Sequence, residues 1–259
     1  MASTINYLSE PTTVSMADEW FEIASPDHFW MERRFEVFCS LVEELDLGTL
    51  RIGEIGCGHG AVLRQFRDRL GVQVDGFDLN KYALEHGLEC DRELDLFCYD
   101  INDRRPELHQ AFDGLILFDV IEHIDDDGGF LDSVRHHLKP GGFVAVNVPG
   151  SMKLFSAYDE VAGHVRRYEP ETLADLAERT GFQVDRWTWW GRPLRPIARL
   201  RQRVVAGMDR DKVIRRGFKP PGRLGNTLLR MLSRMERIPQ HDKGCSLMAI
   251  LRHTGEESP

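Results

Sequence analysis

The sequence lacks any uninterrupted apolar run close to the roughly 20 residues that a membrane-spanning helix needs. Residues 1–11 also lack the basic-then-apolar order of a secretory signal. Both absences favour a soluble, cytoplasmic protein. The sequence shows no internal repeat and no low-complexity tract, so a repeat architecture is not expected.

Cysteine is scarce, and its placement excludes two kinds of cross-linked scaffold. The five cysteines are an odd number without any Cys-x-x-Cys pair: Cys39, Cys57, Cys90, Cys98 and Cys245. This pattern argues against a disulfide framework and against a structural zinc site. We expect reduced, mostly buried thiols.

The composition predicts a large domain, or a domain with an insertion. The chain has 259 residues, 42% hydrophobic and 29% charged, which is enough to bury a substantial core. Its net charge of -9 is uneven, because residues 192–237 carry 14 Lys or Arg against three acids, a net +11. The rest carries -20. This asymmetry predicts a basic surface on an acidic body, with an anionic substrate, a membrane or nucleic acid as candidate partners.

Short apolar runs alternate with amphipathic stretches through most of the chain. The expected strands cover residues 50–55, 72–77, 94–99, 112–118, 143–148, 182–190 and 246–251. The expected helices cover residues 17–47, 61–70, 81–87, 129–138 and 170–180, with a Lys-Pro-Gly-Gly stop at 139–142. Strands that are apolar on both faces predict a doubly wound, mostly parallel α/β sheet covered by helices.

Four segments follow from this pattern. Residues 1–48 are expected to form an N-terminal helical flank or lid, and 49–190 the ligand-binding α/β core. Residues 191–243 are expected to form a basic helical insertion and candidate substrate cap, since apolar residues recur there with helical period. Residues 244–259 complete the core with the last strand and a tail.

A glycine-rich loop occupies residues 54–60, with the sequence Glu-Ile-Gly-Cys-Gly-His-Gly, where the first core strand turns into a helix. Alternate glycines let the backbone turn sharply and let a ligand approach closely. A tight turn without a ligand is the simpler alternative. The spacing differs from the Gly-x-Gly-x-x-Gly of dinucleotide sites, and Glu54 would repel a phosphate but can hold an ammonium group.

Two aspartates follow the next two strands. Asp78 comes 18 residues after Gly60, where an acid that accepts hydrogen bonds from both ribose hydroxyls is expected. Asp100 follows the third strand and is suited to accept a bond from an adenine amino group. Each could instead cap a helix or a turn. Because ligands gather at the carboxyl ends of parallel strands, we interpret the loop and both aspartates as one nucleotide site.

These motifs resemble those of the class I S-adenosylmethionine-dependent methyltransferases over roughly residues 50–190. The matching features are residues 54–60, Asp78, Asp100, Phe-Asp-Val-Ile-Glu-His-Ile at 118–124 and Leu-Lys-Pro-Gly-Gly at 138–142. The 118–124 stretch resembles the post-strand motif of small-molecule methyltransferases such as those of quinone biosynthesis. The resemblance implies a seven-stranded sheet whose final strand, residues 246–251, runs antiparallel.

The resemblance also implies S-adenosyl-L-methionine as the cofactor and S-adenosyl-L-homocysteine as the product. The implied cofactor-binding set is Glu54, Gly56, Cys57, Gly58 and Gly60 at the methionine end, Asp78 and Leu79 at the ribose, Asp100 and Ile101 at the adenine, and Asp119, Val120 and Ile121 at the methionine and sulfonium side. No metal is predicted: Asp125 to Asp127 could attract a cation, but consecutive acids before a helix more often cap it.

Two histidines are candidate bases, because an enzyme that methylates a hydroxyl benefits from a proton acceptor. His123 follows the fourth core strand, and its usual pKa near 6.5 suits this role, although it could merely close the turn. His164 lies in the loop after the fifth strand, among candidate substrate-binding residues. These are Tyr158, Arg166, Arg167 and Tyr168.

The paired arginines could hold a carboxylate or phosphate of the acceptor in a two-point fork. Alternatively they pair with Asp159 and Glu160 and only order the loop. The aromatic clusters at residues 28–30 and 187–190 could contact a ligand, but such residues more often form core. We expect the loop to contribute to substrate binding.

The basic insertion has three interpretations. Its arginines could be the solvated face of two amphipathic helices, could contact an anionic membrane peripherally, or could bind nucleic acid. The acidic body and the scarcity of aromatic residues in the segment argue against nucleic acid.

The sequence therefore predicts a methyltransferase that acts on oxygen or carbon of a small-molecule acceptor, which could be anionic or lipid-linked. One alternative is a nicotinamide-dependent oxidoreductase, favoured by the glycine loop and Asp78 but opposed by the glycine spacing and Glu54. The other is a non-catalytic module that docks on a polyanion through the basic insertion.

Overall fold

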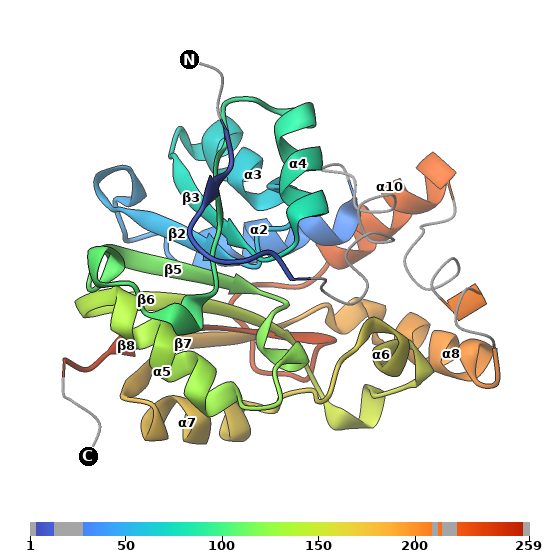
Figure 1. Cartoon of the computed structure of the whole chain (residues 1–259). Helices are drawn as coiled ribbons and strands as arrows, with labels where there is room; N and C mark the ends of the chain where they lie inside the picture. The colour runs from blue at the N-terminus through green and yellow to red at the C-terminus, as the bar shows by residue number, and fades with distance from the viewer. Residues whose placement is uncertain (1–3, 13–27, 209–211, 214–221, 256–259) are drawn as a thin grey trace.

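A single sheet of eight strands organises the computed structural model, which describes residues 4–12, 28–208, 212–213 and 222–255 (Figure 1). The strands are β1 (Asn6–Tyr7), β2 (Ile52–Ile55), β3 (Val74–Asp78), β4 (Asp95–Cys98), β5 (Phe112–Phe118), β6 (Leu138–Pro149), β7 (Phe182–Trp190) and β8 (Ser246–His253). Their order is β1-β4-β3-β2-β5-β6-β8-β7. Every pair is parallel except the two that β8 makes with β6 and β7.

The predicted seven-stranded, mostly parallel sheet with an antiparallel last strand is confirmed. The eighth strand, β1, was not predicted. It pairs Asn6 with Phe97 and Tyr7 with Cys98 at the edge of the sheet. Two residues are too few to show the alternation by which a strand is recognised in a sequence.

Helices cover both faces of the sheet (Figure 1). They are α2 (Phe29–Leu41), α3 (Ala61–Leu70), α4 (Lys81–Cys90), α5 (Asp127–His137), α6 (Ala157–Ala162), α7 (Pro170–Arg179), α8 (Arg195–Val205) and α10 (Gly222–Ser233). Apolar residues of α2, α3 and α4 pack on one face, and those of α5 and α7 on the other. This is the doubly wound arrangement that alternating strands and helices predict.

Helix α2 is fixed over the sheet by aromatic contacts. Phe66 of α3 lies 5.2 Å from Phe35 and 5.3 Å from Phe38, measured between ring centroids. All three are buried, and burying such a side chain contributes about 1.5–3 kcal/mol. The described helix is shorter than the predicted 17–47: it begins after the N-cap His28 and ends at Leu41, and residues 17–27 lie outside the described residues.

Two local predictions need correction. The Lys-Pro-Gly-Gly stretch does not separate helix from strand, because β6 already begins at Leu138, which pairs with Phe112. Gly141, with a φ of 76°, is part of an irregularity inside the strand. The region after Pro149 is not only loop, since it contains α6. Six residues are too few for helical periodicity, and Ser156 and Asp159 instead start α6 with a reciprocal capping box.

The predicted insertion lies between β7 and β8, and its two apolar-periodic stretches form α8 and α10. The expected solvated basic face is present only in part: Arg199, Arg203 and Arg223 are exposed, whereas two further arginines pair with α2. Arg230 and Arg234 of this region turn inward and pair with Glu32 and Glu36 of α2. An apolar stripe on α10 faces outward instead: Leu224 is 89% exposed, Leu228 66% and Met231 64%.

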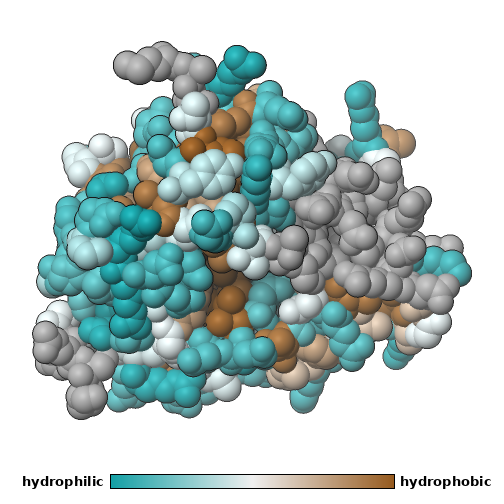
Figure 2. All heavy atoms as spheres, viewed as in Figure 1, coloured by the Kyte–Doolittle hydropathy of each residue, from teal (hydrophilic) through white to brown (hydrophobic). Residues whose placement is uncertain are grey.

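Helix α8 also exposes an apolar side, and apolar surface is visible beside it at the lower right of Figure 2. Ile197, Leu200 and Val204 are exposed, whereas Val205 is buried. Arg210, Arg215, Arg216 and Lys219 lie outside the described residues. None of the described helices is long and apolar enough to cross a membrane.

Candidate active site

The candidate site lies where β2, β3, β4 and β5, which are neighbours in the sheet, reach their carboxyl ends. The glycine loop follows β2, Asp78 ends β3, and Asp100 and Asp119 follow β4 and β5. The sheet therefore brings these predicted residues to one edge, as parallel strands require.

The glycine loop is held against the next strand by backbone hydrogen bonds. The amides of Gly56 and Cys57 both donate to the carbonyl of Phe77, at 2.8 and 3.1 Å. Gly56 has a φ of 75°, and a Cβ atom there would lie 2.7 Å from Cγ2 of Val120. Only glycine fits this conformation and this approach. Burial raises the pKa of the Cys57 thiol, so the thiol is inert.

Glu54 lies beneath the loop and is only 3% exposed. Its Oε2 atom is buried and has no hydrogen-bond partner among the described residues. Burial raises the pKa of Glu54 to about 8; the nearby Arg34 opposes this shift and Asp78 adds to it. A buried carboxyl with an unused acceptor needs a donor or a cation. The ammonium group of a bound amino acid, such as the methionine end of the expected cofactor, fits this requirement.

Asp78 closes the glycine loop. Its Oδ2 accepts from the amide of Gly58 at 2.7 Å, and its Oδ1 accepts from the amide of Asn80 at 2.8 Å. A carboxylate offers about four acceptor positions, so two remain for ribose hydroxyls. Burial raises the pKa of Asp78. The neighbouring Leu79 has its carbonyl bonded to the amide of Thr12.

Asp100 caps a short helix, which was the alternative considered for this residue beside an adenine contact. Its Oδ1 accepts from the amide of Asn102 at 2.9 Å and starts the short η2 helix (Ile101–Asp103). Ile101 is buried in the core. The cap occupies one carboxylate oxygen, so Oδ2 stays a candidate acceptor for an adenine amino group.

Asp119 is held from two elements, α2 and β6. The residue has a φ of 60°, and its carboxylate accepts from Arg34 of α2 at 2.6 Å and from Asn147 of β6 at 2.5 Å. Asn147 in turn accepts from the indole nitrogen of Trp190. Sequence reasoning missed Arg34 and Asn147, because neither stands in a motif. Val120 packs against Gly56, whereas the side chain of Ile121 is fully buried in the core, so only its backbone can face a ligand.

The predicted substrate-binding arginines contact carboxylates of the protein. Arg167 donates to Oδ1 of Asp159 at 2.8 Å and to the carbonyl of Gly150 at 3.1 Å. Arg166 pairs with Asp127. Arg167 therefore forms the loop-ordering ion pair with Asp159 that was the alternative to substrate binding. Glu160 is not a partner, because α6 turns its side chain to solvent.

The two predicted tyrosines lie inside the structure. Tyr168 is 3% exposed, and its hydroxyl donates to Asp127 at 2.9 Å. Tyr158 is 6% exposed, and the guanidinium of Arg201 lies 4.1 Å from its ring centroid. Asp126 caps α5 by accepting from the amide of Gly129, as consecutive acids before a helix favour.

The aromatic clusters form core. Trp189 and Trp190 are 1% and 0% exposed, and the ring of Trp30 lies 4.2 Å from that of Trp190. Their packing fixes α2 against β7. A direct ligand contact is not supported for either buried ring.

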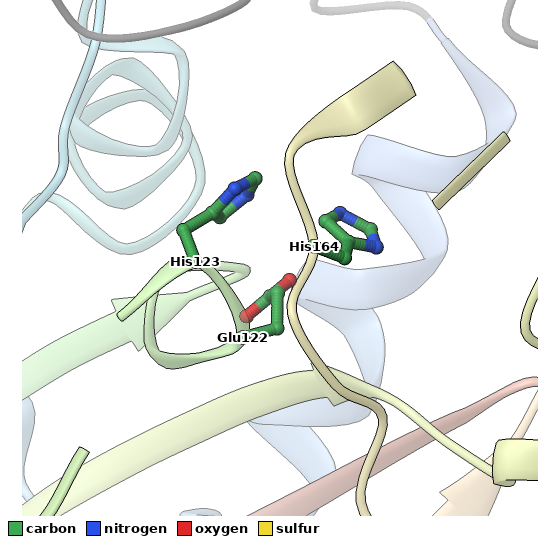
Figure 3. Close-up of side chains that lie close together, drawn as sticks. All are labelled: Glu122, His123 and His164. Carbon is green, nitrogen blue, oxygen red and sulfur yellow. The ribbon is translucent and has the colours of Figure 1, made fainter. Parts of the chain in front are cut away.

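The two predicted histidines do meet, although they are 41 positions apart (Figure 3). The rings of His123 and His164 are 4.8 Å apart, with Glu122 beside them. His123 reaches the surface, yet the surrounding protein and the neighbouring His164 lower its pKa to about 4. A neutral imidazole at pH 7 is the form that accepts a proton or binds a metal ion.

The sheet order, the antiparallel β8 and the glycine loop after β2 together define a class I methyltransferase fold. A family model described as a methyltransferase domain matches residues 30–186. The chain therefore belongs to the methyltransferase domain family. The resemblance drawn from the motifs is confirmed, and with it S-adenosyl-L-methionine as the cofactor that this class uses.

Similar proteins agree with this family. A "Ubiquinone biosynthesis O-methyltransferase" of Xanthomonas oryzae pv. oryzae is 30% identical over 135 residues, 49% of this chain and 55% of the relative. The chain spans about half the length of the curated relatives it matches.

Solved structures share the fold at lower identity. A SAM dependent methyltransferase from Archaeoglobus fulgidus has a TM-score of 0.53 at 20% identity, covering 86% of this chain and 96% of that one. Phosphoethanolamine N-methyltransferase 2 of Haemonchus contortus, solved with S-adenosyl-L-methionine, has a TM-score of 0.54 at 22% identity. The match covers 86% of this chain and 53% of that one.

Proposed function

We propose that this chain transfers the methyl group of S-adenosyl-L-methionine to an oxygen of a small-molecule acceptor. The observation that carries the proposal is the pair of acids at the glycine loop. Glu54 keeps a buried, unpartnered oxygen, and Asp78 bridges the loop while retaining acceptor capacity. A phosphate-binding site would not place a buried acid at this position.

Each residue of the proposed cofactor site has a separate task. Glu54 accepts from the ammonium group, Asp78 from the ribose hydroxyls and Asp100 from the adenine amino group. Asp119 is held in place by Arg34 and Asn147, so that it and the Val120 backbone border the methionine and sulfonium side. The cofactor supplies an already activated methyl group, so the protein mainly has to align the acceptor with it and exclude water.

Oxygen is favoured over carbon as the acceptor atom by two observations. The relatives that match about half of the chain are named as O-methyltransferases. In addition, His123 and His164 lie together beside the end of β5, where the proton of an acceptor hydroxyl can be received. A carbon acceptor that is already a carbanion would not need them.

A lipid-linked acceptor is supported by the outer surface of α8 and α10. Exposed Leu224, Leu228 and Met231 form a stripe on α10, and Arg223 lies exposed at the start of the same helix. An apolar stripe with neighbouring cations is typical of helices that lie on an anionic membrane. We infer that this surface lets the enzyme reach an acceptor held at a membrane.

Calorimetric titration with S-adenosyl-L-homocysteine tests the cofactor half of the proposal. We expect one site per chain. Absence of binding by folded protein would contradict the proposed function. For the acceptor half, enzyme and isotope-labelled S-adenosyl-L-methionine are incubated with a lipid extract and, separately, with water-soluble metabolites. A labelled methyl ether in the lipid extract is the expected product; a labelled carbon–methyl bond would contradict oxygen as the acceptor atom.

A further inference from the structure

Glu122, His123 and His164 converge beside the carboxyl end of β5 (Figure 3). Each offers one ligand atom, and these atoms lie within 4.8 Å of one another. Glu122 and His123 belong to the η4 turn (Ile121–His123), whereas His164 follows α6. The amide of Val165 donates to the carbonyl of Glu122 at 2.9 Å, so a backbone hydrogen bond holds the two segments side by side.

Both imidazoles are oriented through the same ring nitrogen. Nδ1 of His123 lies 3.2 Å from the carbonyl of Gly163, and Nδ1 of His164 lies 3.0 Å from Oδ1 of Asp159. A proton on each Nδ1 satisfies these acceptors and leaves the lone pair on each Nε2. A metal-binding histidine typically donates its other nitrogen to a carbonyl or carboxylate in this way.

The acceptors that orient the histidines are themselves fixed. Asp159 is fully buried and accepts from Arg167 and from the backbone of Ser156. Gly163 ends α6 with a φ of 78°, a left-handed conformation that favours glycine, and this reversal presents its carbonyl to His123. The loop is thus built to hold both rings.

The burial of Glu122 supports a metal site independently of how the two histidines are oriented. Its side chain is fully buried, and neither carboxyl oxygen has a hydrogen-bond partner among the described residues. A buried carboxylate is costly unless it is paired or coordinates a metal. Arg34 and Asn147 donate to Asp119, and neither makes a hydrogen bond to the Glu122 carboxyl group within the described part of the chain.

We propose that Glu122, His123 and His164 bind one divalent transition-metal ion of the Zn²⁺ type. Two imidazoles and one carboxylate suit such an ion, and three protein ligands leave a position open for a further oxygen. In a tetrahedral site, bonds of about 2.0–2.1 Å place ligand atoms about 3.3–3.4 Å apart. The ligand atoms here lie within 4.8 Å of one another, so they need to approach by about 1.5 Å or less.

The role of the ion rests on the proposed function. The ion would lower the pKa of an acceptor hydroxyl bound at the open position. The proton then passes to water instead of to His123 or His164, because the Nε2 atoms of both histidines bind the ion. The resulting oxygen anion forms the new bond to the methyl carbon, while the pair of the carbon–sulfur bond stays on sulfur. No metal is predicted from the sequence, where Asp125 to Asp127 were the cation site considered. His164 lies 41 positions beyond His123, and no motif spacing links the two.

Metal binding is tested on the full chain after removal of metal by a chelator. Zn²⁺ is titrated by calorimetry, and Co²⁺ is followed by its visible absorption, which reports a low coordination number. We expect one ion per chain. Glu122→Gln and His164→Ala should each weaken Zn²⁺ binding at least tenfold and remove the Co²⁺ bands. Glu160→Gln and His241→Ala, which change an exposed acid and an exposed histidine, are the matched controls.

Three results would overturn the proposal: no stoichiometric Zn²⁺ binding by folded protein, equal loss of binding in the controls, or unchanged binding in both cluster variants. Glu122→Gln keeps the side-chain volume and removes a buried charge, so its fold is preserved and its result is decisive. Titration with S-adenosyl-L-homocysteine on the same samples separates the two proposals. Intact binding of this ligand without Zn²⁺ binding contradicts only the metal site.

Discussion

The cofactor side and the acceptor side of the molecule are built in different ways. On the cofactor side, the predicted residues stand at strand ends, and the glycine loop and Asp78 contact each other across adjacent strands. On the acceptor side, α6, the loop after it and the insertion are held by ion pairs between distant segments, such as Arg166 with Asp127 and Arg230 with Glu32.

This difference has a consequence for mutation. A change on the cofactor side should mainly alter ligand affinity, because the surrounding sheet is stable without the side chain. A change in a buried ion pair on the acceptor side should alter the fold first, because removing one partner leaves an unpaired charge.

Arg167→Ala should have the largest effect on stability. Arg167 and Asp159 are 7% and 0% exposed at their side chains, so the variant removes the guanidinium that pairs with a buried carboxylate and leaves only the contacts from His164 and Ser156. We expect a loss of about 3–5 kcal/mol in the free energy of unfolding, measured with urea. Arg179→Ala, an exposed arginine 3.3 Å from Asp127, should cost less than about 1 kcal/mol. Equal losses would remove the distinction between buried and exposed pairs.

Asp78→Ala tests the opposite behaviour on the cofactor side. The variant loses two acceptor positions for ribose hydroxyls, and bonds to a charged acceptor contribute about 1.5–3 kcal/mol each. We expect S-adenosyl-L-homocysteine to bind at least about tenfold more weakly in calorimetry. Asp75→Ala, at the other end of the same strand, should bind normally. An unchanged dissociation constant for natively folded Asp78→Ala would exclude this residue from the site.

Glu54 should make the cofactor-free protein less stable as the pH rises. Its folded pKa of about 8 lies above the ordinary value of 4.5, so between these values the folded state binds the extra proton. The contribution of Glu54 to the free energy of unfolding is largest below pH 4.5 and declines as the pH rises towards 8. Glu54→Gln should remove the decline and be more stable at pH 8 by about 1–3 kcal/mol. Parallel pH profiles of wild type and variant, from urea unfolding, would contradict this assignment.

Leu228→Glu should have the smallest effect on stability, within about 0.5 kcal/mol, because the side chain is already 66% exposed. It should nevertheless abolish co-sedimentation with phosphatidylglycerol vesicles, which we expect for the wild type but not with phosphatidylcholine alone. Leu70→Glu is the matched control at an exposed leucine of α3. If the wild type does not bind the anionic vesicles, the stripe on α10 is not a membrane surface.

Much of the cofactor side was predictable because its signals are local. The bounds of α3 and β5 coincide with the predicted helix and strand, since hydrophobic period and glycine positions define both. The meeting of the glycine loop with Asp78 also follows, because parallel strands end at one edge. The capping by Asp100 did not follow, because acids at strand ends serve both ligands and turns.

The acceptor side was less predictable because its contacts join residues far apart in the sequence. On the acceptor side, Asp159 and Glu160 were the carboxylates considered as partners of Arg166 and Arg167, but the fold pairs Arg166 with Asp127. On the cofactor side, Arg34 is a comparable case: it stands in α2 with no motif around it, yet it donates to Asp119. No periodicity or spacing reports such pairs.

By itself the sequence determined the class of fold, the family and the edge of the sheet at which the proposed cofactor site lies, since apolar periods, glycines and strand-end acids act over a few residues. Only the tertiary structure decided which groups meet beyond that edge. It buried Glu122 beside two histidines with no hydrogen-bond partner among the described residues, and it turned the apolar stripe of α10 outward. The physical reason is that burial, ion pairing and the exposure of a helix face depend on how distant segments pack, which a local pattern does not encode.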